Sequence, residues 1–293
     1  MKRYFILYFA FILVTPSLIA QQADTSKTSV PKRWSKKTDI IITMEQTQID
    51  NWSAGGYSNF TFGSFLKGYY NYLNGKHKLD NTLELSYGRT RQDISGDGIW
   101  DNSNRWKKSD DKVELNSIYG YKAVGNWNYS VLLNLKSQFD NGYKNDTILI
   151  SAGLSPATLT SSAGLEYKKK YFSVLFSFLT GKTVYVLDKR LRGRSLGYSD
   201  EIDDAWKFSL GSYIKLFYNR DITKNINILC KMDFFYDYEK PLIDTDISGE
   251  VFVTFKIFKY LSTFFDIQMV MDKDFSTDLQ FKERFGISIP FTF

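Results

Sequence analysis

Over most of this chain, apolar and polar residues alternate one by one. The clearest run closes the sequence, where Phe285, Ile287, Ile289, Phe291 and Phe293 stand at every second position. Because successive side chains of a β-strand point to opposite faces, such a run predicts a strand with one apolar and one polar face.

The same period recurs from residue 38 onward, for example over 127–136, 206–219 and 226–238. Counting these runs predicts about twelve strands, each of roughly 12 to 16 residues. Strands of soluble sandwiches are typically about 5 or 6 residues long, whereas a tilted strand needs about 9 to 11 residues to cross the hydrocarbon of a bilayer. The strand length therefore favours a transmembrane barrel over the alternative, a secreted β-sandwich.

The connections between the runs alternate between short and long. Short turns are expected near Asn74-Gly75, Gly125-Asn126, 168–170, Arg220-Asp221 and Lys259-Tyr260. Longer polar connections are expected near 92–110, 140–156, 188–204, 239–246 and 272–279. This alternation is typical of outer-membrane barrels, which have short periplasmic turns and longer outer loops. The predicted fold is all-β, an antiparallel up-and-down barrel in the outer membrane, with both termini periplasmic because the strand number is even.

The N-terminus carries an export signal rather than a strand. Lys2 and Arg3 precede an apolar stretch over 4–14, and the small residue Ala20 precedes a polar segment. This is the pattern of a signal peptide, residues 1–20, since the apolar stretch is too short for the alternative, a membrane anchor. Residues 21–37 are polar and patternless and are interpreted as a flexible periplasmic leader. The barrel is expected over residues 38–293.

A short motif follows the first predicted strand. It reads Asn51-Trp52-Ser53-Ala54-Gly55-Gly56, and farther on comes Leu154-Ser155-Pro156-Ala157. With these elements the chain resembles an uncharacterised outer-membrane barrel family of Bacteroidota, marked by W-x-x-G-G after the first strand, over nearly the whole mature chain. The family has no established activity, so the resemblance implies fold and location only. Trp52, Gly55 and Gly56 are expected to close a loop at the outer rim.

The terminal aromatic residue carries a second expectation. Bacterial outer-membrane barrels characteristically end on an aromatic residue of an alternating strand, and the barrel class thus implies that Phe291 and Phe293 form a signal for the barrel-assembly machinery. Outer-membrane lipid and that machinery are the expected partners, with an envelope protein as a possible further one.

Composition excludes several alternatives. Aromatic residues make up 17% of the chain and there are only 5 prolines, which suits long strands. Cys230 is the single cysteine, so an intrachain disulfide is impossible. The 38 Lys and Arg residues exceed the 32 Asp and Glu residues only slightly and are scattered, so no nucleic-acid partner is expected.

Catalytic and metal-binding patterns are weak. The single histidine, His77, follows the first short turn and lies on the apolar phase of its strand. A Ser-His enzyme needs its histidine beside a nucleophile, usually near the outer leaflet, so His77 is at the wrong end of the barrel and faces the wrong way. The acid pairs Asp110-Asp111 and Asp203-Asp204, and Asp244 with Asp246, are expected to be solvated in loops. The segment 93–98 has the composition of a calcium loop without its spacing. We expect no catalytic residue, no metal and no cofactor.

The polar phase of the strands supplies the candidate site, a set of charged side chains facing the lumen. It comprises Lys67, Glu84, Lys112, Glu114, Lys136, Lys207, Lys215, Lys231, Asp233, Lys256, Asp266, Lys282 and Arg284. One interpretation is an ion-pair network that fills a narrow lumen, because opposite charges in a low dielectric pair. The other is a narrow polar conduit with a weak preference for anions.

These features predict a non-enzymatic outer-membrane protein, either structural or accessory or a narrow solute channel. The alternative class is an interaction subunit of an outer-membrane secretion or assembly complex. A barrel enzyme acting on lipid or peptide is the least favoured class.

Overall fold

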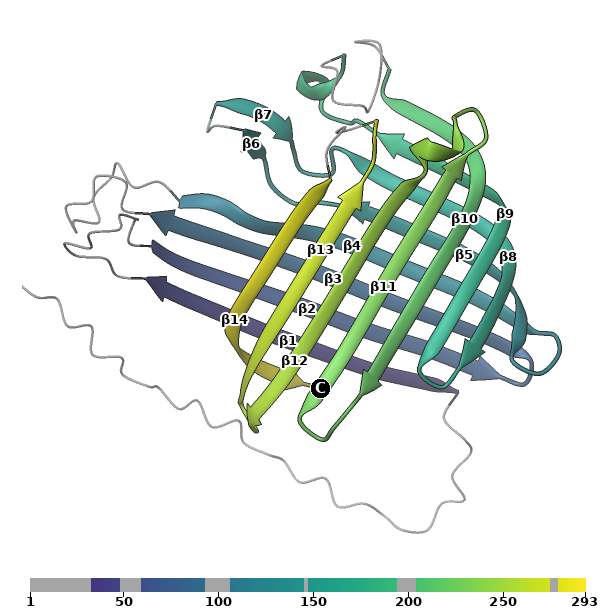
Figure 1. Cartoon of the computed structure of the whole chain (residues 1–293), viewed down its shortest axis with the longest axis horizontal. Coiled ribbons are helices and arrows are strands. Elements are labelled where there is room, and N and C mark those ends of the chain that lie inside the picture. Colours follow the sequence, from purple (N-terminus) through teal and green to yellow (C-terminus); the bar gives the residue numbers. More distant parts are fainter. Residues whose placement is uncertain (1–32, 48–58, 93–105, 145–146, 194–203, 275–278) are drawn as a thin grey trace, which may run out of the picture. The chain divides into compact units, whose positions relative to one another are not determined.

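Twelve long strands form one closed antiparallel barrel in the computed structural model (Figure 1). The structure describes residues 33–47, 59–92, 106–144, 147–193, 204–274 and 279–293. The strands of the barrel are β1 (Trp34–Thr47), β2 (Asn59–Asn74), β3 (His77–Gln92), β4 (Trp106–Lys122), β5 (Trp127–Ser137), β8 (Ala157–Lys169), β9 (Phe172–Tyr185), β10 (Trp206–Asp221), β11 (Ile226–Asp237), β12 (Asp246–Phe258), β13 (Leu261–Met271) and β14 (Gln280–Thr292). The predicted fold class and strand number are confirmed.

Each strand pairs with its neighbours in the sequence, with two exceptions. Between β5 and β8 the chain makes a small separate hairpin, β6 (Gly142–Lys144) and β7 (Ile148–Ser151). The ring is then closed by pairing of β1 with β14. Short 3₁₀ turns, η1 (Lys189–Leu191) and η2 (Leu242–Asp244), lie in two of the long connections. No helix of the described residues has the length and apolar character needed to cross a membrane.

Strand β5 shows how the sequence sets the two faces of the barrel. Its side chains alternate between exposed and buried, with Tyr129, Val131 and Leu133 exposed on the outer face. Ser130 and Asn134 are buried on the inner face, where the barrel wall shields them from solvent. The predicted alternation is therefore present, with apolar side chains outside and mainly polar ones inside.

The connections follow the expected order of short and long. Gly75 and Gly125 sit in short turns with φ of 59° and 58°, a left-handed conformation that glycine adopts without strain. Trp34 at the start of β1 lies opposite Tyr72, near the β2–β3 turn, and the backbone of Phe293 bonds to that of Thr38. The beginning of β1 and the end of β14 therefore lie at the short-turn end.

Two expected boundaries differ from the observed ones. β1 begins at Trp34, before the expected barrel start at residue 38, and β4 begins at Trp106 within the expected loop 92–110. Asp110 and Asp111 thus lie in a strand rather than in a solvated loop, and the expectation for this pair was wrong. Both misplaced strand ends are rich in Lys, Ser and Asp, so they carry no apolar alternation that marks a strand.

Apolar side chains fill part of the interior in two clusters. One consists of Ile118, Leu132, Leu175, Tyr213 and Phe235. The other consists of Phe65, Leu229, Phe252 and Phe264, with Ile41 and Phe217 packed against it. Because these residues point inward from several strands, the lumen is partly filled by side chains.

Candidate functional site

Halfway along the barrel, carboxylates and ammonium groups from several strands form a cluster that we call the waist. Glu84 of β3 contacts Lys112 of β4 at 2.9 Å and Lys67 of β2 at 3.9 Å, and it also forms an ion pair with Lys231 of β11. Glu84 is only 5% exposed. Buried carboxylates are stable as anions only when paired in this way.

The waist joins opposite walls of the barrel. In the ring of twelve strands, β3 lies diametrically opposite β11, and β4 lies opposite β12. The Glu84–Lys231 pair therefore crosses the lumen, as does the contact of Lys112 with Glu250 at 3.3 Å. Lys112 also contacts Glu114 at 2.9 Å, which links neighbouring positions on the same strand. The side chains of the waist thus bridge the lumen from wall to wall.

A second cluster adjoins the waist around Asp233 of β11. Its carboxylate accepts from Lys136 and Lys215, each at 2.9 Å, and from the Tyr213 hydroxyl at 2.8 Å. Lys136 comes from β5 and Lys215 from β10, so this cluster also joins strands that are not neighbours. Asn134 on β5 donates to Glu114 at 3.1 Å, and Glu114 lies opposite Lys136 in the β4–β5 register, so the two clusters adjoin.

A third cluster lies on the long-loop side of the waist. Arg284 and Lys282 of β14 each contact Asp110 of β4 at 2.5 Å, and Arg284 also pairs with Asp266 of β13. The Arg284 guanidinium lies over the Phe65 ring at 4.5 Å, and Lys67 similarly lies over Phe252 at 4.6 Å. Cations placed on aromatic faces gain a further attraction there.

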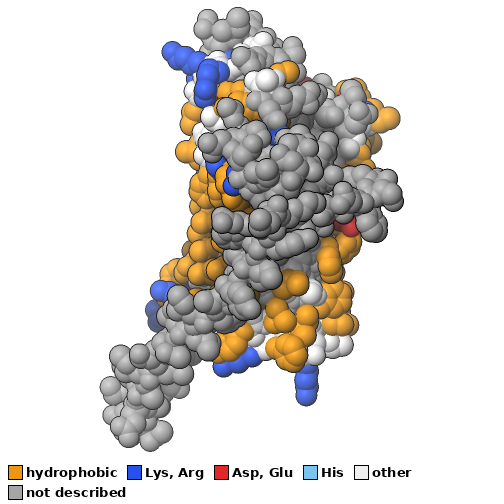
Figure 2. All heavy atoms as spheres, turned by 90° about the vertical axis from the view of Figure 1, so that its left-hand side faces the viewer, with side chains coloured by type: hydrophobic (Ala, Val, Ile, Leu, Met, Phe, Trp, Pro, Cys, Tyr) orange, Lys and Arg blue, Asp and Glu red, His pale blue; other side chains and the backbone are white. Residues whose placement is uncertain are grey.

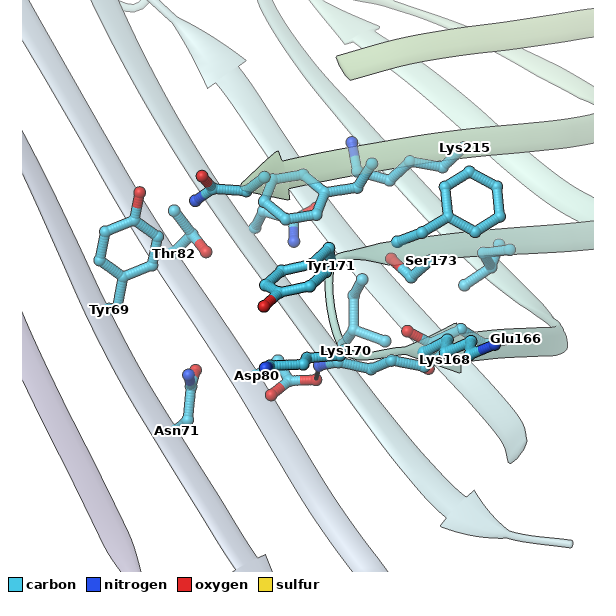
Figure 3. A pocket seen from close by; sticks show the side chains of 17 residues that line it. Tyr69, Asn71, Asp80, Thr82, Glu166, Lys168, Lys170, Tyr171, Ser173 and Lys215 are labelled. Atoms are coloured by element: carbon cyan, nitrogen blue, oxygen red, sulfur yellow. Dashed lines mark hydrogen bonds and ion pairs between the residues drawn. The ribbon is translucent and has the colours of Figure 1, made fainter. Parts of the chain in front are cut away.

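Toward the short-turn end the lumen opens into a cavity of about 270 Å³, here called the short-turn vestibule (Figure 3). Asn71 and Asp80 lie on one wall, across from Lys168 and Tyr171 on the other. Lys168 donates to Asp80 at 2.5 Å, and Lys78 pairs with Glu166 beside them. Both carboxylates that line this cavity, Asp80 and Glu166, are therefore paired with lysines.

Toward the opposite end lies a larger cavity of about 450 Å³, the long-loop vestibule. Its lining includes Thr61, Gly88, Asp110 and Arg284 from the inner face of the barrel. The cluster of Asp110, Lys282 and Arg284 separates this vestibule from the waist. Between the two vestibules a smaller cavity of about 160 Å³ lies at the waist, lined by Lys112, Lys136 and Glu250 among others. The lumen of the described residues is therefore narrowed at the waist by charged and apolar side chains.

Most of the charged residues expected to face the lumen lie in these clusters. The exceptions are Lys207, which contacts Asp274 at 3.5 Å near the long-loop end, and Lys256, which is exposed near the β12–β13 turn and has no ion pair among the described residues.

Several residues of the site escaped sequence reasoning. Glu250 is central to the waist and shares the inward phase of Lys256 on β12, so the alternation could have identified it. Asp110 escaped because its strand end has no apolar alternation. Lys182 contacts Asp246 at 2.6 Å and Asp272 at 3.3 Å, so Asp246 is not simply solvated in a loop.

The remaining candidates lie apart from the lumen. His77 lies on the outer face at the short-turn end, where its Nδ1 is 2.7 Å from the Tyr119 hydroxyl oxygen. Trp52, Gly55 and Gly56, the segment 93–98 and Asp203 lie outside the described residues. Within the described ranges, no group of three or more His, Cys, Asp or Glu side chains is arranged to hold a metal ion.

The architecture of the described residues defines a class of protein. A closed antiparallel barrel with an apolar outer face and a polar interior is the architecture of transmembrane β-barrels. Residues 44–143 match a family described as a protein of unknown function, DUF3078. Among curated proteins, none is significantly similar to the chain.

Several solved structures have a loosely similar barrel and are distant in sequence. An outer membrane channel from Pseudomonas putida shares 9% identity, with 91% of this chain and 99% of that one covered and a TM-score of 0.38. The outer membrane phospholipase A from Escherichia coli shares 11% identity, with 86% and 89% covered and a TM-score of 0.37. The translocator domain of the autotransporter NalP from Neisseria meningitidis shares 12% identity, with 92% and 90% covered and a TM-score of 0.32. Likeness at this level carries no conclusion about function.

Proposed function

We propose that this chain is a non-enzymatic outer-membrane barrel with a structural or accessory role, and that its lumen is closed at the waist rather than open as a solute channel. The observation that carries the proposal is the pair of contacts across the lumen, Glu84 with Lys231 and Lys112 with Glu250. Each joins opposite walls of the barrel through side chains that are largely shielded from solvent.

The outer surface supports placement in a membrane. Large apolar side chains such as Leu133, Phe178 and Phe285 are 50%, 84% and 64% exposed, which is costly in water but favourable in lipid. Figure 2 shows apolar side chains along the flanks of the barrel, while many of the visible lysine and arginine side chains lie toward its ends. Closure of the ring also pairs the edges of β1 and β14 with each other over their shared stretch, as a bilayer requires of backbone groups.

Features of the sequence support a location in the outer membrane. The signal peptide expected over 1–20 would direct export, and the terminal Phe293 would be recognised by the barrel-assembly machinery. In this placement the short turns and both termini face the periplasm, with the long connections outside. An envelope-protein partner remains a further proposal, since the long connections would be available to it.

The orientation can be tested with cysteine substitutions in a Cys230→Ser background. Lys189→Cys and Ile243→Cys lie in long connections and should react with an impermeant thiol reagent on intact cells. Lys169→Cys and Val124→Cys lie at the short-turn end and should react only after the outer membrane is opened. Labelling of the second pair on intact cells would invert the orientation.

The closed lumen is favoured over the conduit by the pairing of its charges. Asp233 and Glu84 each contact more than one lysine, so few charges are left to attract a passing ion. A catalytic role for His77 is disfavoured by its position on the outer face, where its ring lies between Tyr119 and Tyr121. An enzyme of the Ser-His type needs its base beside a nucleophile within a binding cleft.

Recording from pure protein in planar bilayers tests the closed waist. The wild-type protein should produce no steady conductance, whereas a Lys231→Ala and Glu250→Ala double variant should conduct, because it removes one partner from each contact across the lumen. The single variant Lys256→Gln, which changes a lysine outside the waist, should remain silent. A steady conductance of the wild-type protein would overturn the proposal in favour of a channel.

A further inference from the structure

The short-turn vestibule carries more cations than its own carboxylates neutralise. Its charged lining consists of four lysines and two carboxylates, namely Lys168, Lys169, Lys170, Lys215, Asp80 and Glu166. Both carboxylates are already paired with lysines, and Lys215 is held by Asp233 at 2.9 Å. Lys169 and Lys170 have no ion pair among the described residues. The cavity therefore presents unneutralised ammonium groups to a ligand from outside.

The short turns around the mouth of this cavity add further positive charge. An exposed lysine stands at or beside each of the five short turns, namely Lys76, Lys122, Lys170, Lys224 and Lys259. The same turns hold a single carboxylate, that of Asp221. Charge of one sign around an opening raises the local concentration of ligands of the opposite sign. An anionic group is therefore attracted to this end of the barrel.

Uncharged polar side chains on the walls are available for hydrogen bonding. Tyr69 and Asn71 of β2 and Ser173 of β9 line the vestibule, and none of these side chains is hydrogen-bonded within the described part of the chain. Figure 3 shows Tyr69 and Asn71 across the cavity from Tyr171 and Ser173. Hydroxyl and amide groups both donate and accept, so these walls suit a ligand that carries donors and acceptors along its length.

Apolar side chains line the vestibule between the turn lysines and the waist. Ile118 and Leu175 belong to one of the two apolar clusters of the interior, and Phe217 packs against the other. An apolar group that enters past the lysines is therefore removed from water at this depth. The clusters also make the vestibule a pocket rather than the start of an open path.

The tyrosine rings at the mouth are already in contact with cations. The Lys170 ammonium lies 4.8 Å from the centroid of the Tyr171 ring, and the Arg220 guanidinium lies 5.1 Å from it. Lys37 lies over the Tyr69 ring at 5.9 Å. These contacts occupy the rings on which a sugar would otherwise stack. Recognition of a ligand falls instead to the lysines and the uncharged polar groups.

We propose that the short-turn vestibule binds the free C-terminal end of a peptide whose last residue is apolar. The terminal carboxylate lies against Lys169 and Lys170, the last side chain contacts Ile118 and Leu175, and backbone amide groups bond to the walls. The cavity of about 270 Å³ is slightly smaller than the roughly 300 to 1,000 Å³ of sites for drug-sized ligands, so it takes only the end of a chain. The inference rests on the proposed membrane placement, which turns this cavity toward the periplasm.

Fluorescence anisotropy tests the site with the full mature protein in detergent micelles. The probe is a rhodamine-labelled hexapeptide that ends in valine, made once with a free carboxylate and once with a terminal amide. The free acid should bind at least about tenfold more tightly, because the amide loses charge-assisted hydrogen bonds to lysine. A free-acid peptide that ends in serine should bind about tenfold less tightly than the valine peptide, because it leaves the apolar lining uncovered.

Two sets of variants locate the binding. The double variant Lys169→Gln and Lys170→Gln should abolish the preference for the free acid. Lys259→Gln is the matched control and should leave the affinity unchanged, because Lys259 is also exposed on a short turn and lies over a tyrosine ring, at 4.9 Å, but does not line the vestibule.

Ser173→Phe should block binding of both peptides by filling the cavity, with folding verified by the heat-dependent shift of barrels on gels. Asn71→Ala is a smaller change in the same cavity and should weaken both peptides, which keeps the test decisive where Ser173→Phe does not fold.

Equal affinity for the free acid and the amide, or an equal loss in Lys259→Gln and in the double variant, would overturn the site, since the attraction would then come from the rim as a whole. Displacement of the probe by oligogalacturonate more readily than by unlabelled valine peptide would also overturn it, in favour of an acidic saccharide. Labelling of Lys169→Cys on intact cells would instead contradict the periplasmic orientation, on which binding in micelles does not depend, so the two failures are distinguishable.

Discussion

The waist and the long-loop rim use the same kind of ion pair in different ways. At the waist, Glu84 contacts lysines from three strands, β2, β4 and β11, in an environment that excludes most solvent. At the rim, Asp188 contacts Arg190, two residues away in the same turn, and the arginine side chain is 59% exposed. The first arrangement connects distant parts of the chain, whereas the second only shapes a local turn.

The difference shows that the position of a charge pair decides its energetic weight. A buried carboxylate that is shared by several cations leaves uncompensated charges when it is removed, at a cost of roughly 3 to 5 kcal/mol. An exposed pair is solvated whether or not it forms and contributes about 0 to 1 kcal/mol. The same substitution should therefore have very different consequences at the two places.

The largest effect is expected for Glu84→Gln. The change leaves Lys67, Lys112 and Lys231 with less compensating charge and should destabilise the folded barrel by roughly 3 to 5 kcal/mol. Thermal unfolding in detergent, followed by the heat-dependent gel shift, measures this loss. Asp188→Asn is the matched control at the rim and should unfold like the wild-type protein. If both variants unfold alike, water screens the waist and the interior is a conduit, in which case a shift in ion selectivity should accompany Glu84→Gln.

A smaller effect is expected for a charge placed on the lipid face. Val131→Lys puts an ammonium on the outside of β5, where the native side chain is 49% exposed, and should cost roughly 2 to 4 kcal/mol near the bilayer midplane. Thr82→Lys places the same group in the short-turn vestibule of about 270 Å³, where water and carboxylates can receive it. Folded yield in vesicles compares the two, and equal yields would refute the assignment of inner and outer faces.

The smallest effect is expected at the rim and concerns pH. Hydrogen bonds from Tyr87 and Arg89 lower the pKa of Asp140 to about 2, below the ordinary value of about 3.9. Because the pKa of Asp140 is lower in the folded state, these contacts stabilise the segment that leads into the β6–β7 hairpin above about pH 4. The stabilisation is lost as the pH falls toward 2.

A fluorophore at Phe139→Cys in a Cys230→Ser background should report this acid transition. Arg89→Gln removes a donor and should move the transition to higher pH, while Arg190→Gln, a rim arginine elsewhere, should not. A transition that stays in place with Arg89→Gln would show that this pairing does not control the local structure.

The alternation of residues was sufficient to predict the fold and the facing of most charged side chains. Lys136, Lys215 and Asp233 were identified because their neighbours in the sequence are apolar and point outward into lipid. Such a signal exists only where a strand crosses the hydrocarbon. Two strand ends, Trp34 to Lys37 and the region of Asp110, extend beyond the hydrocarbon. Their residues are mostly polar on both faces, so the alternation that predicts a strand is missing there.

The contacts between charged residues could not be predicted in the same way. Whether Glu84 meets Lys231 or another lysine depends on the stagger of twelve strands and on the distance across the lumen. The two residues are separated by 147 positions in the sequence, and no local pattern encodes that distance. The alternation assigns a residue to the interior, but only the closed ring determines its partner.

The short pairing of β1 with β14 also bears on how the barrel is assembled and taken apart. These strands share six register pairs, against fourteen between β1 and β2, and their contact between Asp39 and Thr292 spans 253 residues. Hairpins between neighbouring strands form from local contacts, whereas this joint must wait until the rest of the sheet exists. It should therefore be the last joint to close during assembly and the first to open on unfolding. An insertion factor that holds the edges of β1 and β14 apart would then control the rate at which the finished barrel is released.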